Sequence, residues 1–382
     1  MKLLLISNEY PPIGGGGSIV VKYLARDLVC LGHEVVVLTS SFSGLANKET
    51  IDGYKVIRVP SIRLRRDYCS MWELLTFSLS ALIYSIYYYF IFKPDITQAF
   101  FAVPAGGISF VLNILFKLPY VIFLGGSDVP NANPYRYKNM YPILSPIIKL
   151  IWSRADSVVA ASNGLKKIAE NADPKRKFVM IPNGVDTKYF KSGKKSKKII
   201  NILGIGRLMP RKGYQFVVEA LEEVEGKVKS KFIFTIVGGG DYMKELKLLA
   251  KKNKVDNLVK FKGQIDYSEI RKLLSTSDIF VHPSLAEGMP LSLLEAISSG
   301  LPSITTKIAG NEDLVKNGVN GYLLKVGDVQ GISNSLVKLI DDQKLRQKMG
   351  LESARISKNY DWKKISKAYD LIYKNIYAKR KK

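Results

Sequence analysis

The chain has few of the residues that cross-link proteins or bind metals. Cys30 and Cys69 are its only cysteines, and His33 and His282 its only histidines, among 382 residues. Two cysteines in so long a chain exclude a disulfide scaffold and fit a reducing cytosol. Two histidines disfavour any mechanism that needs several imidazoles, and the sequence shows no cluster of metal ligands.

The start of the chain lacks the long apolar run of a signal peptide. The apolar segment Met1–Ile6 is short, and Asn8, Glu9 and a Pro-Pro pair follow it closely. We expect this segment to be a first buried strand and the protein to be cytoplasmic.

Acidic residues are scarce relative to basic ones. There are 33 Asp and Glu against 58 Lys and Arg, which gives a formal charge of +25. Residues 1–198 contribute 26 − 13 = +13 and the remainder 32 − 20 = +12, so the excess is spread along the chain. This even spread weakens a nucleic-acid function and favours anionic small substrates or an anionic membrane surface as partners.

The apolar content of 47% excludes intrinsic disorder. Short β-branched runs alternate with segments of helical spacing, as in Lys2–Ser7 and Glu34–Thr39 on either side of Ser18–Leu31. This alternation predicts parallel sheets covered by helices. The further strands predicted in the first half are Lys55–Val59, Ile96–Phe100, Tyr120–Phe123, Ser157–Ala160 and Phe178–Ile181. The second half is predicted to contain the strands Ile199–Ile205, Phe232–Val237, Val259–Lys262, Ile279–Val281 and Ser303–Thr305, and the helices Gly213–Val224, Tyr242–Asn253, Tyr267–Ser275 and Leu291–Ser299.

A polar, charged segment without periodicity, residues 191–198, separates the halves. We interpret it as a linker between a first domain at 1–192 and a second domain that starts at 193. Ligands of doubly wound sheets bind beyond the carboxyl ends of the strands, so we expect a site in a cleft between the two halves.

Residues 74–92 carry no charge and are long enough to span a membrane. A span is disfavoured because the segment lies between strands that should share one sheet. A buried crossover helix and an interfacial helix lying on the membrane both remain open. The interfacial alternative is supported by neighbouring aromatic and basic residues: Trp72, Tyr84, Tyr87, Tyr88, Tyr89, Arg63, Arg65, Arg66 and Lys93.

Four glycines, residues 14–17, follow the first predicted strand and precede the first helix. Glycines there let a ligand approach the backbone and the amides of a helix N-terminus, although a flexible turn would look the same. The dinucleotide-binding fingerprint fits poorly, because the second strand ends in Leu38-Thr39-Ser40 without an acidic residue. A nicotinamide-dependent dehydrogenase is therefore disfavoured.

Arg207, Arg211 and Lys212 follow the first strand of the second half. Fixed cations at the carboxyl end of a strand suit a diphosphate, although solvated surface cations remain an alternative.

The segment Ser284–Glu295 is the most informative. Pro290 suits the first position of a helix, so a helix should open at or just before it, with free amides such as that of Leu291 facing a ligand. Glu287 precedes this helix and Glu295 lies inside it, so the two carboxylates could bind different hydroxyls of one ligand. A helix N-terminal acid and a solvated helix residue are the alternatives.

With seven residues between them, Glu287 and Glu295 reproduce the E-x7-E motif of glycosyltransferase family 4, a retaining family with the GT-B fold, which this chain resembles. The resemblance covers about residues 1–375 and includes the segments Ile181–Phe190, Gly206–Gly213, Val237–Gly240, Phe261–Gly263, Asn311–Gly321 and Tyr360–Trp362. It implies two Rossmann-like, doubly wound parallel-sheet domains facing a cleft. The first domain (1–192) would bind the acceptor and the second (193–362) the nucleotide sugar, and a final helix (363–382) would pack back on the first.

The resemblance also implies roles for individual residues. Arg207 and Lys212 would bind the donor diphosphate, Glu287 the hydroxyls of the transferred sugar, and Glu295 the ribose. Together with Asp128, which would orient the acceptor or the sugar, Arg207, Lys212 and Glu287 would be the catalytic residues. Backbone groups would complete the donor site at Gly15, Gly16, Gly263, Gly288, Met289, Pro290 and Leu291.

One loop of the first half departs from the family pattern. Many members have a His in an H-G-x-D sequence after a strand, whereas here Gly125 stands at that position, followed by Gly126 and Asp128. No imidazole is therefore supplied at this point.

The function implied is retaining transfer of a hexosyl unit from a UDP- or GDP-linked sugar to a glycan or lipid-linked acceptor. The absence of an Asp-x-Asp triplet fits a reaction without a metal, and no cofactor is expected besides the nucleotide sugar. We expect the enzyme on the inner face of the cell membrane, bound to anionic lipid and not to nucleic acid, in cell-envelope polysaccharide synthesis. The alternative is a basic scaffold of this fold that binds nucleic acid or membrane without transferase activity. An epimerase or phosphorylase would need an acid–base pair or a cofactor lysine, and neither is indicated.

Overall fold

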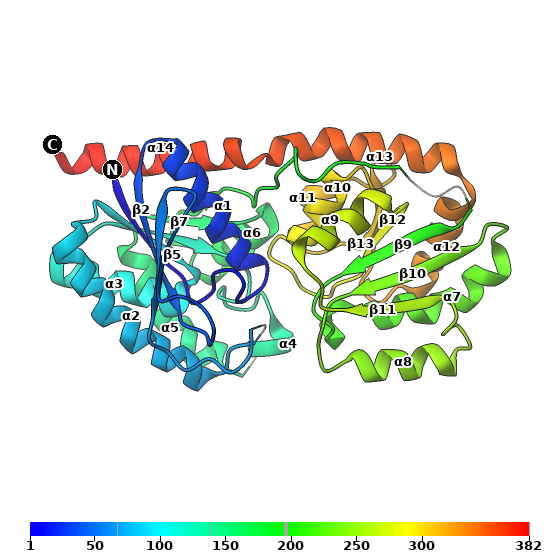
Figure 1. Ribbon diagram of the computed structural model, residues 1–382, viewed down its shortest axis with the longest axis horizontal. Helices are drawn as coiled ribbons and strands as arrows, with labels where there is room; N and C mark the ends of the chain where they lie inside the picture. Colours follow the sequence, from blue (N-terminus) through cyan, green and yellow to red (C-terminus); the bar gives the residue numbers. More distant parts are fainter. Residues whose placement is uncertain (67, 138, 195–197, 382) are drawn as a thin grey trace. The chain divides into compact units, whose positions relative to one another are not determined.

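The computed structural model describes residues 1–66, 68–137, 139–194 and 198–381, and these form two compact units. The first unit comprises Met1–Asn183 and Trp362–Lys382, and the second comprises Gly184–Asp361. Positions 195–197 of the predicted linker lie outside the described residues. Each unit is a sheet with helices packed on it (Figure 1).

An eight-stranded sheet is the centre of the first unit. Its strands are β1 (Lys2–Ile6), β2 (Glu34–Ser40), β3 (Lys48–Ile51), β4 (Tyr54–Val59), β5 (Ile96–Phe100), β6 (Tyr120–Leu124), β7 (Ser157–Ala160) and β8 (Val179–Met180). They lie in the order β3-β4-β2-β1-β5-β6-β7-β8 and pair in parallel, except that β3 is antiparallel to β4. The chain reverses its direction of progress across the sheet between β1 and β5, which is where sheets of this type bind ligands.

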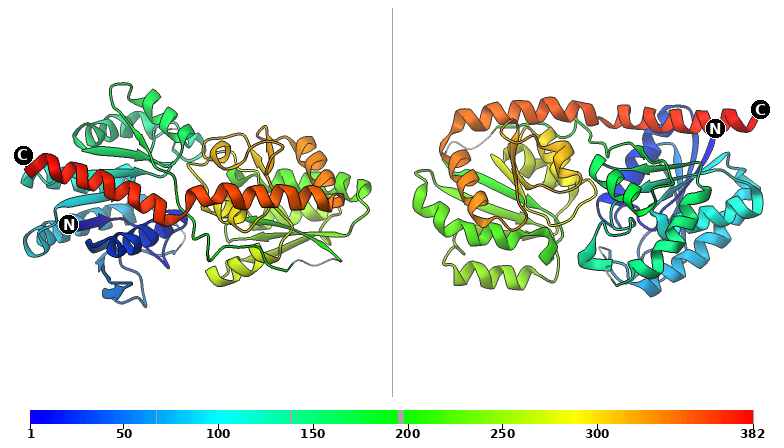
Figure 2. Two further views of the ribbon diagram at one scale, coloured as in Figure 1. Left: turned by 90° about the horizontal axis from the view of Figure 1, so that it is seen from above. Right: turned by 180° about the vertical axis from the view of Figure 1, so that it is seen from behind.

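Helices cover both faces of this sheet. They are α1 (Gly16–Cys30), α2 (Met71–Phe92), α3 (Gly107–Phe116), α4 (Pro134–Tyr137), α5 (Tyr141–Arg154), α6 (Asn163–Ala172) and α14 (Trp362–Lys381). Figure 1 shows α2, α3 and α5 on one face and α1 with α14 on the other. The last helix, red in Figure 2, returns to the first unit as expected. It is fixed there by a 2.9 Å contact between His33 Nε2 and Asp370 Oδ1 and by the Tyr373 hydroxyl, which donates to Gln98 Oε1 at 2.7 Å.

The second unit has a six-stranded, fully parallel sheet in the order β11-β10-β9-β12-β13-β14. The strands are β9 (Ile200–Ile205), β10 (Phe232–Val237), β11 (Val259–Gly263), β12 (Ile279–His282), β13 (Ser303–Thr306) and β14 (Gly321–Leu324). The helices are α7 (Tyr214–Lys227), α8 (Met243–Lys252), α9 (Tyr267–Thr276), α10 (Leu291–Ser298), α11 (Asn311–Leu314), α12 (Val329–Asp341) and α13 (Gln343–Ser357). A continuous apolar core lies between this sheet and its helices, as the alternation of β-branched runs and helical spacing predicts.

The boundary between the units falls between Asn183 and Gly184, earlier than the predicted position after residue 192. Burial explains the difference. Phe190 is buried in the second unit, its ring meets that of Tyr267 edge-on at 5.5 Å, and its carbonyl accepts a 2.8 Å hydrogen bond from Ser298 Oγ. Residues 184–190, which precede the polar segment 191–198, therefore pack in the second unit and belong to it.

Helix α2 contains the uncharged segment 74–92, for which a membrane span was disfavoured and two other placements were left open. It connects β4 to β5, and both strands belong to one sheet, so a membrane span between them is incompatible with this fold. The helix starts with a capping box between Ser70 and Glu73 and buries one narrow side, which includes Phe77, Ala81 and Ser85. The buried-crossover prediction therefore applies to one side of α2 only, because the opposite side is exposed.

Candidate functional site

The first part of the candidate site follows β9 in the second unit. The chain leaves the strand through Gly206 and Arg207 and makes a short 3₁₀ turn, Pro210–Lys212. Gly213 then adopts φ +75°, and a Cβ there would lie 2.0 Å from the carbonyl oxygen of Pro283. Only glycine fits this close approach, which brings the loop after β9 against the loop after β12.

These two loops place Lys212 beside Glu287. Lys212 Nζ lies 2.5 Å from Glu287 Oε1, and Arg211 Nη1 lies 3.9 Å from the same oxygen. His282 Nε2 lies 3.2 Å from it as well. Arg207 is close enough for its charge to lower the pKa of Lys212. Two cations thus contact one carboxylate and a third, Arg207, lies near Lys212, so the excess positive charge could be neutralised by a diphosphate.

The charge states in this cluster follow from its burial. Burial opposes ionisation of Glu287, but Lys212 and the other positive groups hold its pKa well below the usual range. Burial lowers the pKa of His282, so this imidazole is neutral at neutral pH. An ionised carboxylate can only accept hydrogen bonds. His282 Nε2 therefore carries the proton of the neutral ring and donates a hydrogen bond to Glu287. Glu287 is therefore an ionised carboxylate that these neighbours hold in place.

The loop that follows Glu287 leads directly into α10. The helix begins at Leu291, and Pro290 is the N-cap residue in an extended conformation, whereas Pro290 was expected as the first helical residue. The extended ψ of 121° at Pro290 places the start one residue later. Met289 and Leu291 are buried, and no side chain caps the first-turn amides. The first N–H groups of α10, beginning with that of Leu291, have no acceptor within the helix and can bind an anionic ligand.

Glu295 lies one turn into α10 and is buried, not solvated as one alternative held. Its Oε1 accepts a 2.5 Å hydrogen bond from the Tyr267 hydroxyl. Burial raises the pKa of Glu295 to about 7, although this hydrogen bond acts in the opposite direction. The Tyr267 ring stacks on Tyr189 with centroids 6.2 Å apart, so the carboxyl is held by a rigid aromatic pair. Gly263, the last residue of β11, accepts a 2.8 Å hydrogen bond from Gly238 N.

In the first unit, the glycine run lies between β1 and α1. Gly16 is the first residue of α1 and Gly15 its N-cap residue. The amide of Gly15 is already hydrogen-bonded, at 3.3 Å, to Oε2 of Glu9. An anion that used this amide would therefore have to displace the Glu9 carboxylate.

Asp128 is partly buried in the loop after β6 and accepts hydrogen bonds from the backbone around it. Its Oδ1 accepts hydrogen bonds from Gly125 N and Gly126 N at 3.0 and 2.9 Å, and its Oδ2 accepts one from Ala102 N at 3.1 Å. Burial raises the pKa of Asp128 to about 6, against these hydrogen bonds. All three donors are backbone groups of the same two loops, so Asp128 holds the loop after β5 to the loop after β6.

Phe101 occupies the space that a side chain at position 125 would need. A Cβ on Gly125 would lie 2.4 Å from the Phe101 ring, and one on Gly17 would lie 2.6 Å from it. Phe101 has φ +73°, a left-handed conformation that is rare for an aromatic residue. The glycine at the position of the family's histidine therefore coincides with an aromatic ring held in a strained conformation.

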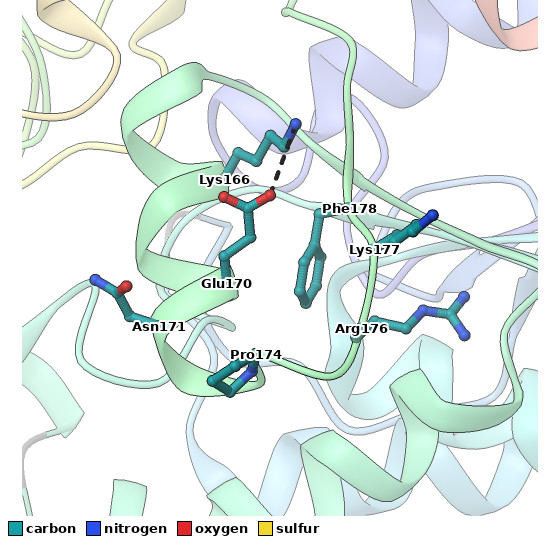
Figure 3. Close-up of a pocket in the computed structure, with 7 residues that line it drawn as sticks. All are labelled: Lys166, Glu170, Asn171, Pro174, Arg176, Lys177 and Phe178. Carbon is teal, nitrogen blue, oxygen red and sulfur yellow. Dashed lines mark ion pairs between the residues drawn. The ribbon is translucent and has the colours of Figure 1, made fainter.

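A surface hollow in the first unit does not contain any of these residues. It is lined by residues of α6 and the segment before β8: Lys166, Glu170, Asn171, Pro174, Arg176, Lys177 and Phe178 (Figure 3). Lys166 is paired with Glu170 at 3.6 Å, and Arg176 donates to backbone carbonyls. The charged groups of the hollow are therefore largely occupied by their own neighbours.

Sequence reasoning missed His282, Tyr267 and Phe101 as members of these clusters. A signal was available for His282, one of two histidines and placed just before Glu287 at the end of a strand. None was available for Phe101 or Tyr267, which reach their positions through tertiary packing. Among the described residues, no three His, Cys, Asp or Glu side chains form a group that could hold a metal ion.

Two family models match the chain. The model described as Glycosyltransferase Family 4 matches residues 14–189, and the one described as Glycosyl transferases group 1 matches residues 185–356. An uncharacterized glycosyltransferase of Methanocaldococcus jannaschii is 31% identical over 263 residues, which cover 66% of this chain and 67% of that protein. The UDP-Gal:alpha-D-GlcNAc-diphosphoundecaprenol alpha-1,3-galactosyltransferase of Escherichia coli is 37% identical over 182 residues, which cover 44% of this chain and 46% of that enzyme.

The fold comparison agrees with the sequence comparison. The structure of sucrose-phosphate synthase from Thermosynechococcus elongatus superposes with a TM-score of 0.88 at 19% identity and covers 99% of both chains. The two α/β units described above are those of the GT-B fold, as predicted. The chain is therefore a GT-B glycosyltransferase and belongs to glycosyltransferase family 4.

Proposed function

We propose that this enzyme transfers a hexosyl unit from a UDP- or GDP-linked sugar to a glycan or lipid-linked acceptor. The observation that carries the proposal is the cluster in which Lys212 and Arg211 contact Glu287 and Arg207 lies near Lys212. It offers fixed positive charge beside one ionised carboxylate, which is what a sugar joined to a diphosphate requires. The diphosphate would share Lys212 and Arg207, and Glu287 would accept hydrogen bonds from hydroxyls of the transferred sugar.

We further propose that the reaction needs no metal ion. Cations and the free amides at the start of α10 would stabilise the charge that develops on the leaving diphosphate. Glu295, held by Tyr267, would bind the ribose of the nucleotide. The backbone of Gly263, Gly288 and Met289 would line the nucleotide side, and that of Gly15 and Gly16 would approach the phosphates once Glu9 has moved.

The proposed stereochemistry is retention. The bond between the anomeric carbon and the diphosphate oxygen breaks, and the acceptor oxygen bonds to the same face of the sugar that the diphosphate leaves. The acceptor proton passes to an oxygen of the departing phosphate. Asp128 would act as a positioning residue for the acceptor side, because it fixes the loops that carry Phe101 and Gly125.

The proposed acceptor is lipid-linked, and the proposed setting is the inner face of the cell membrane, in cell-envelope polysaccharide synthesis. The similarity to an enzyme named for a diphosphoundecaprenol-linked acceptor supports this choice. So does the net charge of +25, which favours anionic lipid over neutral surfaces.

The test is incubation of the purified enzyme with UDP-galactose, UDP-glucose, UDP-N-acetylglucosamine or GDP-mannose in EDTA. The acceptor probe is α-N-acetylglucosaminyl diphosphoundecaprenol, and free glycans serve as a second acceptor set. We expect one donor to yield a product whose anomeric configuration, measured by proton NMR, equals that of the donor. An inverted product would contradict retention, and turnover only after addition of Mg²⁺ would contradict metal independence.

A further inference from the structure

The exposed side of α2 is an unbroken apolar stripe. Trp72, Leu79 and Ile83 follow one another at helical spacing along it, and Trp72 is 80% exposed and Leu79 63% exposed. Leu75 lies between Trp72 and Leu79, Phe90 extends the stripe towards the end of α2, and both side chains are exposed. The side chains that anchor α2 to its own unit all lie on the opposite side of the helix.

The stripe continues on neighbouring helices of the same unit. Helix α3 packs between α2 and α5, and Figure 1 shows the three helices on one face of the sheet. On α5, Ile143, Ile147 and Leu150 are exposed at positions separated by one helical turn, and Ile143 is 72% exposed. We call the set Trp72, Leu79, Ile83, Ile143, Ile147 and Leu150 the apolar face. Exposed apolar side chains gathered on packed helices in this way indicate an interaction surface.

Charge is distributed asymmetrically around the apolar face. Residues 61–154 contain nine basic and four acidic side chains. Three of these acids lie in the described residues and accept hydrogen bonds within the unit. Glu73 belongs to the capping box of α2, Asp95 accepts from the backbone N–H of Lys2, and Asp128 accepts from the backbone of its own loop.

Cations, by contrast, stand at the rim of the apolar face. Lys93 ends α2, Lys117 ends α3, and both side chains are exposed. The two helix ends lie together, because Tyr89 stacks on Phe116 with centroids 4.0 Å apart. Lys149 and Arg154 are exposed on α5. The expected contribution of Arg63 is wrong, since Arg63 is buried and donates to the carbonyls of Asn8 and Arg65.

We propose that the apolar face docks on an anionic lipid bilayer, with α2 and α5 lying in the plane of the interface. Apolar and aromatic side chains would enter the acyl boundary, and the lysines at the rim would meet lipid phosphates. A second copy of this chain is a poorer occupant, because a two-fold contact through this face would bring two basic rims together. The proposal rests on the proposed function in one respect: a bilayer is where a lipid-linked acceptor would be found.

The tryptophans provide a direct readout of docking. The chain has three, and Trp152 and Trp362 are both buried, so only Trp72 can change its environment when the face meets lipid. Full-length protein is mixed with phosphatidylcholine vesicles containing about 30% phosphatidylglycerol, without any sugar nucleotide. We expect a blue shift of the Trp emission and co-sedimentation that weakens as salt is raised. Vesicles of phosphatidylcholine alone should bind much less protein.

The decisive variant is L79S/I83S, which retains Trp72, with L248S/L351S as its matched control. Leu248 and Leu351 are similarly exposed, at 66% and 74%, but lie in the second unit. We expect the first variant to lose about tenfold or more in vesicle partitioning and the control to remain like the wild type. Equal partitioning of the two variants, or no blue shift in the wild type, would overturn the proposal. So would a wild-type dimer in sedimentation velocity that L79S/I83S abolishes, which would assign the face to a second copy. Because no sugar is present, failure here leaves the transfer reaction to its own test.

Discussion

The two units carry different chemistry at the ends of equivalent strands. The loop after β9 in the second unit presents Arg207 and Lys212, and the loop after β12 presents Glu287 to meet them. In the first unit, the corresponding loop after β1 presents glycines, and the loop after β5, the counterpart of β12, carries Phe101, whose ring lies against Gly17 and Gly125. The loops of the second unit therefore bring charged side chains together, whereas those of the first unit bring glycine backbone against an aromatic ring. Changes of charge should act mainly in the second unit, and changes of volume mainly in the first.

The largest effect is expected for K212A. Loss of a fixed cation at the diphosphate should lower kcat by about 10²- to 10³-fold. The substitution also leaves Glu287 buried without its main partner, which should lower the free energy of unfolding by about 3–5 kcal/mol. Urea denaturation and transfer kinetics measure the two effects separately.

The double variant K212A/E287Q separates stability from catalysis. Removal of both charges should restore most of the unfolding free energy, because no unpaired carboxylate remains. Transfer should stay as low as in K212A. A double variant that regained transfer would show that the ion pair is structural and that the diphosphate binds elsewhere.

The next effect concerns Glu295 and pH. Its pKa is about 7 in the folded protein, whereas an unfolded glutamate titrates near 4.5. The folded state therefore binds more protons at Glu295 between these values, so the contribution of Glu295 to stability is largest below pH 4.5 and falls as pH rises towards 7. The full difference corresponds to at most about 3 kcal/mol. E295Q should remove this pH dependence and be more stable than the wild type at pH 8, which thermal denaturation across pH would show. If the stability of the wild type does not change between pH 5 and 7, the raised pKa of the buried Glu295 carboxyl would be contradicted.

A larger side chain at position 125 tests whether the first unit depends on the close packing of Gly125 against Phe101. G125A places a methyl group 2.4 Å from the Phe101 ring and should cost about 1–3 kcal/mol of unfolding free energy. The matched control is G226A in α7, where no atom lies within 4 Å of the added carbon. F101A/G125A should relieve the clash, so the two substitutions should couple in a double-mutant cycle. Additive effects would show that Phe101 and Gly125 do not share this space.

The smallest effect is expected for H282N. His282 donates to Glu287 and is neutral, so its loss should disturb the position of the carboxylate without changing the charge of the cluster. We expect transfer to fall about tenfold, with nucleotide affinity nearly unchanged. A fall as large as that of K212A would mean that His282 carries more than a positioning role.

The fold could be predicted from the sequence where apolar runs are strong. Buried strands such as β5 and β7 appear at the predicted residues, because their β-branched composition has few alternatives. The edge strand β3, Lys-Glu-Thr-Ile, was missed because its polar residues are half exposed and carry no apolar pattern. The strand β14, at the other sheet's edge, was also missed, because its four residues form too short an apolar run to be assigned to a strand.

The candidate site could be predicted only in part. Motif spacing indicated Glu287, Glu295, Arg207 and Lys212, but the direct contact of Lys212 with Glu287 depends on β9 and β12 being neighbours in the sheet. The burial that raises the pKa of Glu295 depends on the packing of α10 against its neighbours, and no pattern in the sequence predicts it. Local spacing thus identifies the residues, and the sheet order determines their partners.

The central claim is that the Lys212–Glu287 cluster binds a nucleoside diphosphate without a metal ion. Calorimetric titration of the enzyme with UDP and with GDP, in EDTA, tests it most directly, with K212A/E287Q as the comparison. We predict saturable binding of one of the two nucleotides and a loss of affinity of about 100-fold in the variant. Absence of binding by both nucleotides, or binding that appears only with Mg²⁺, would contradict the claim.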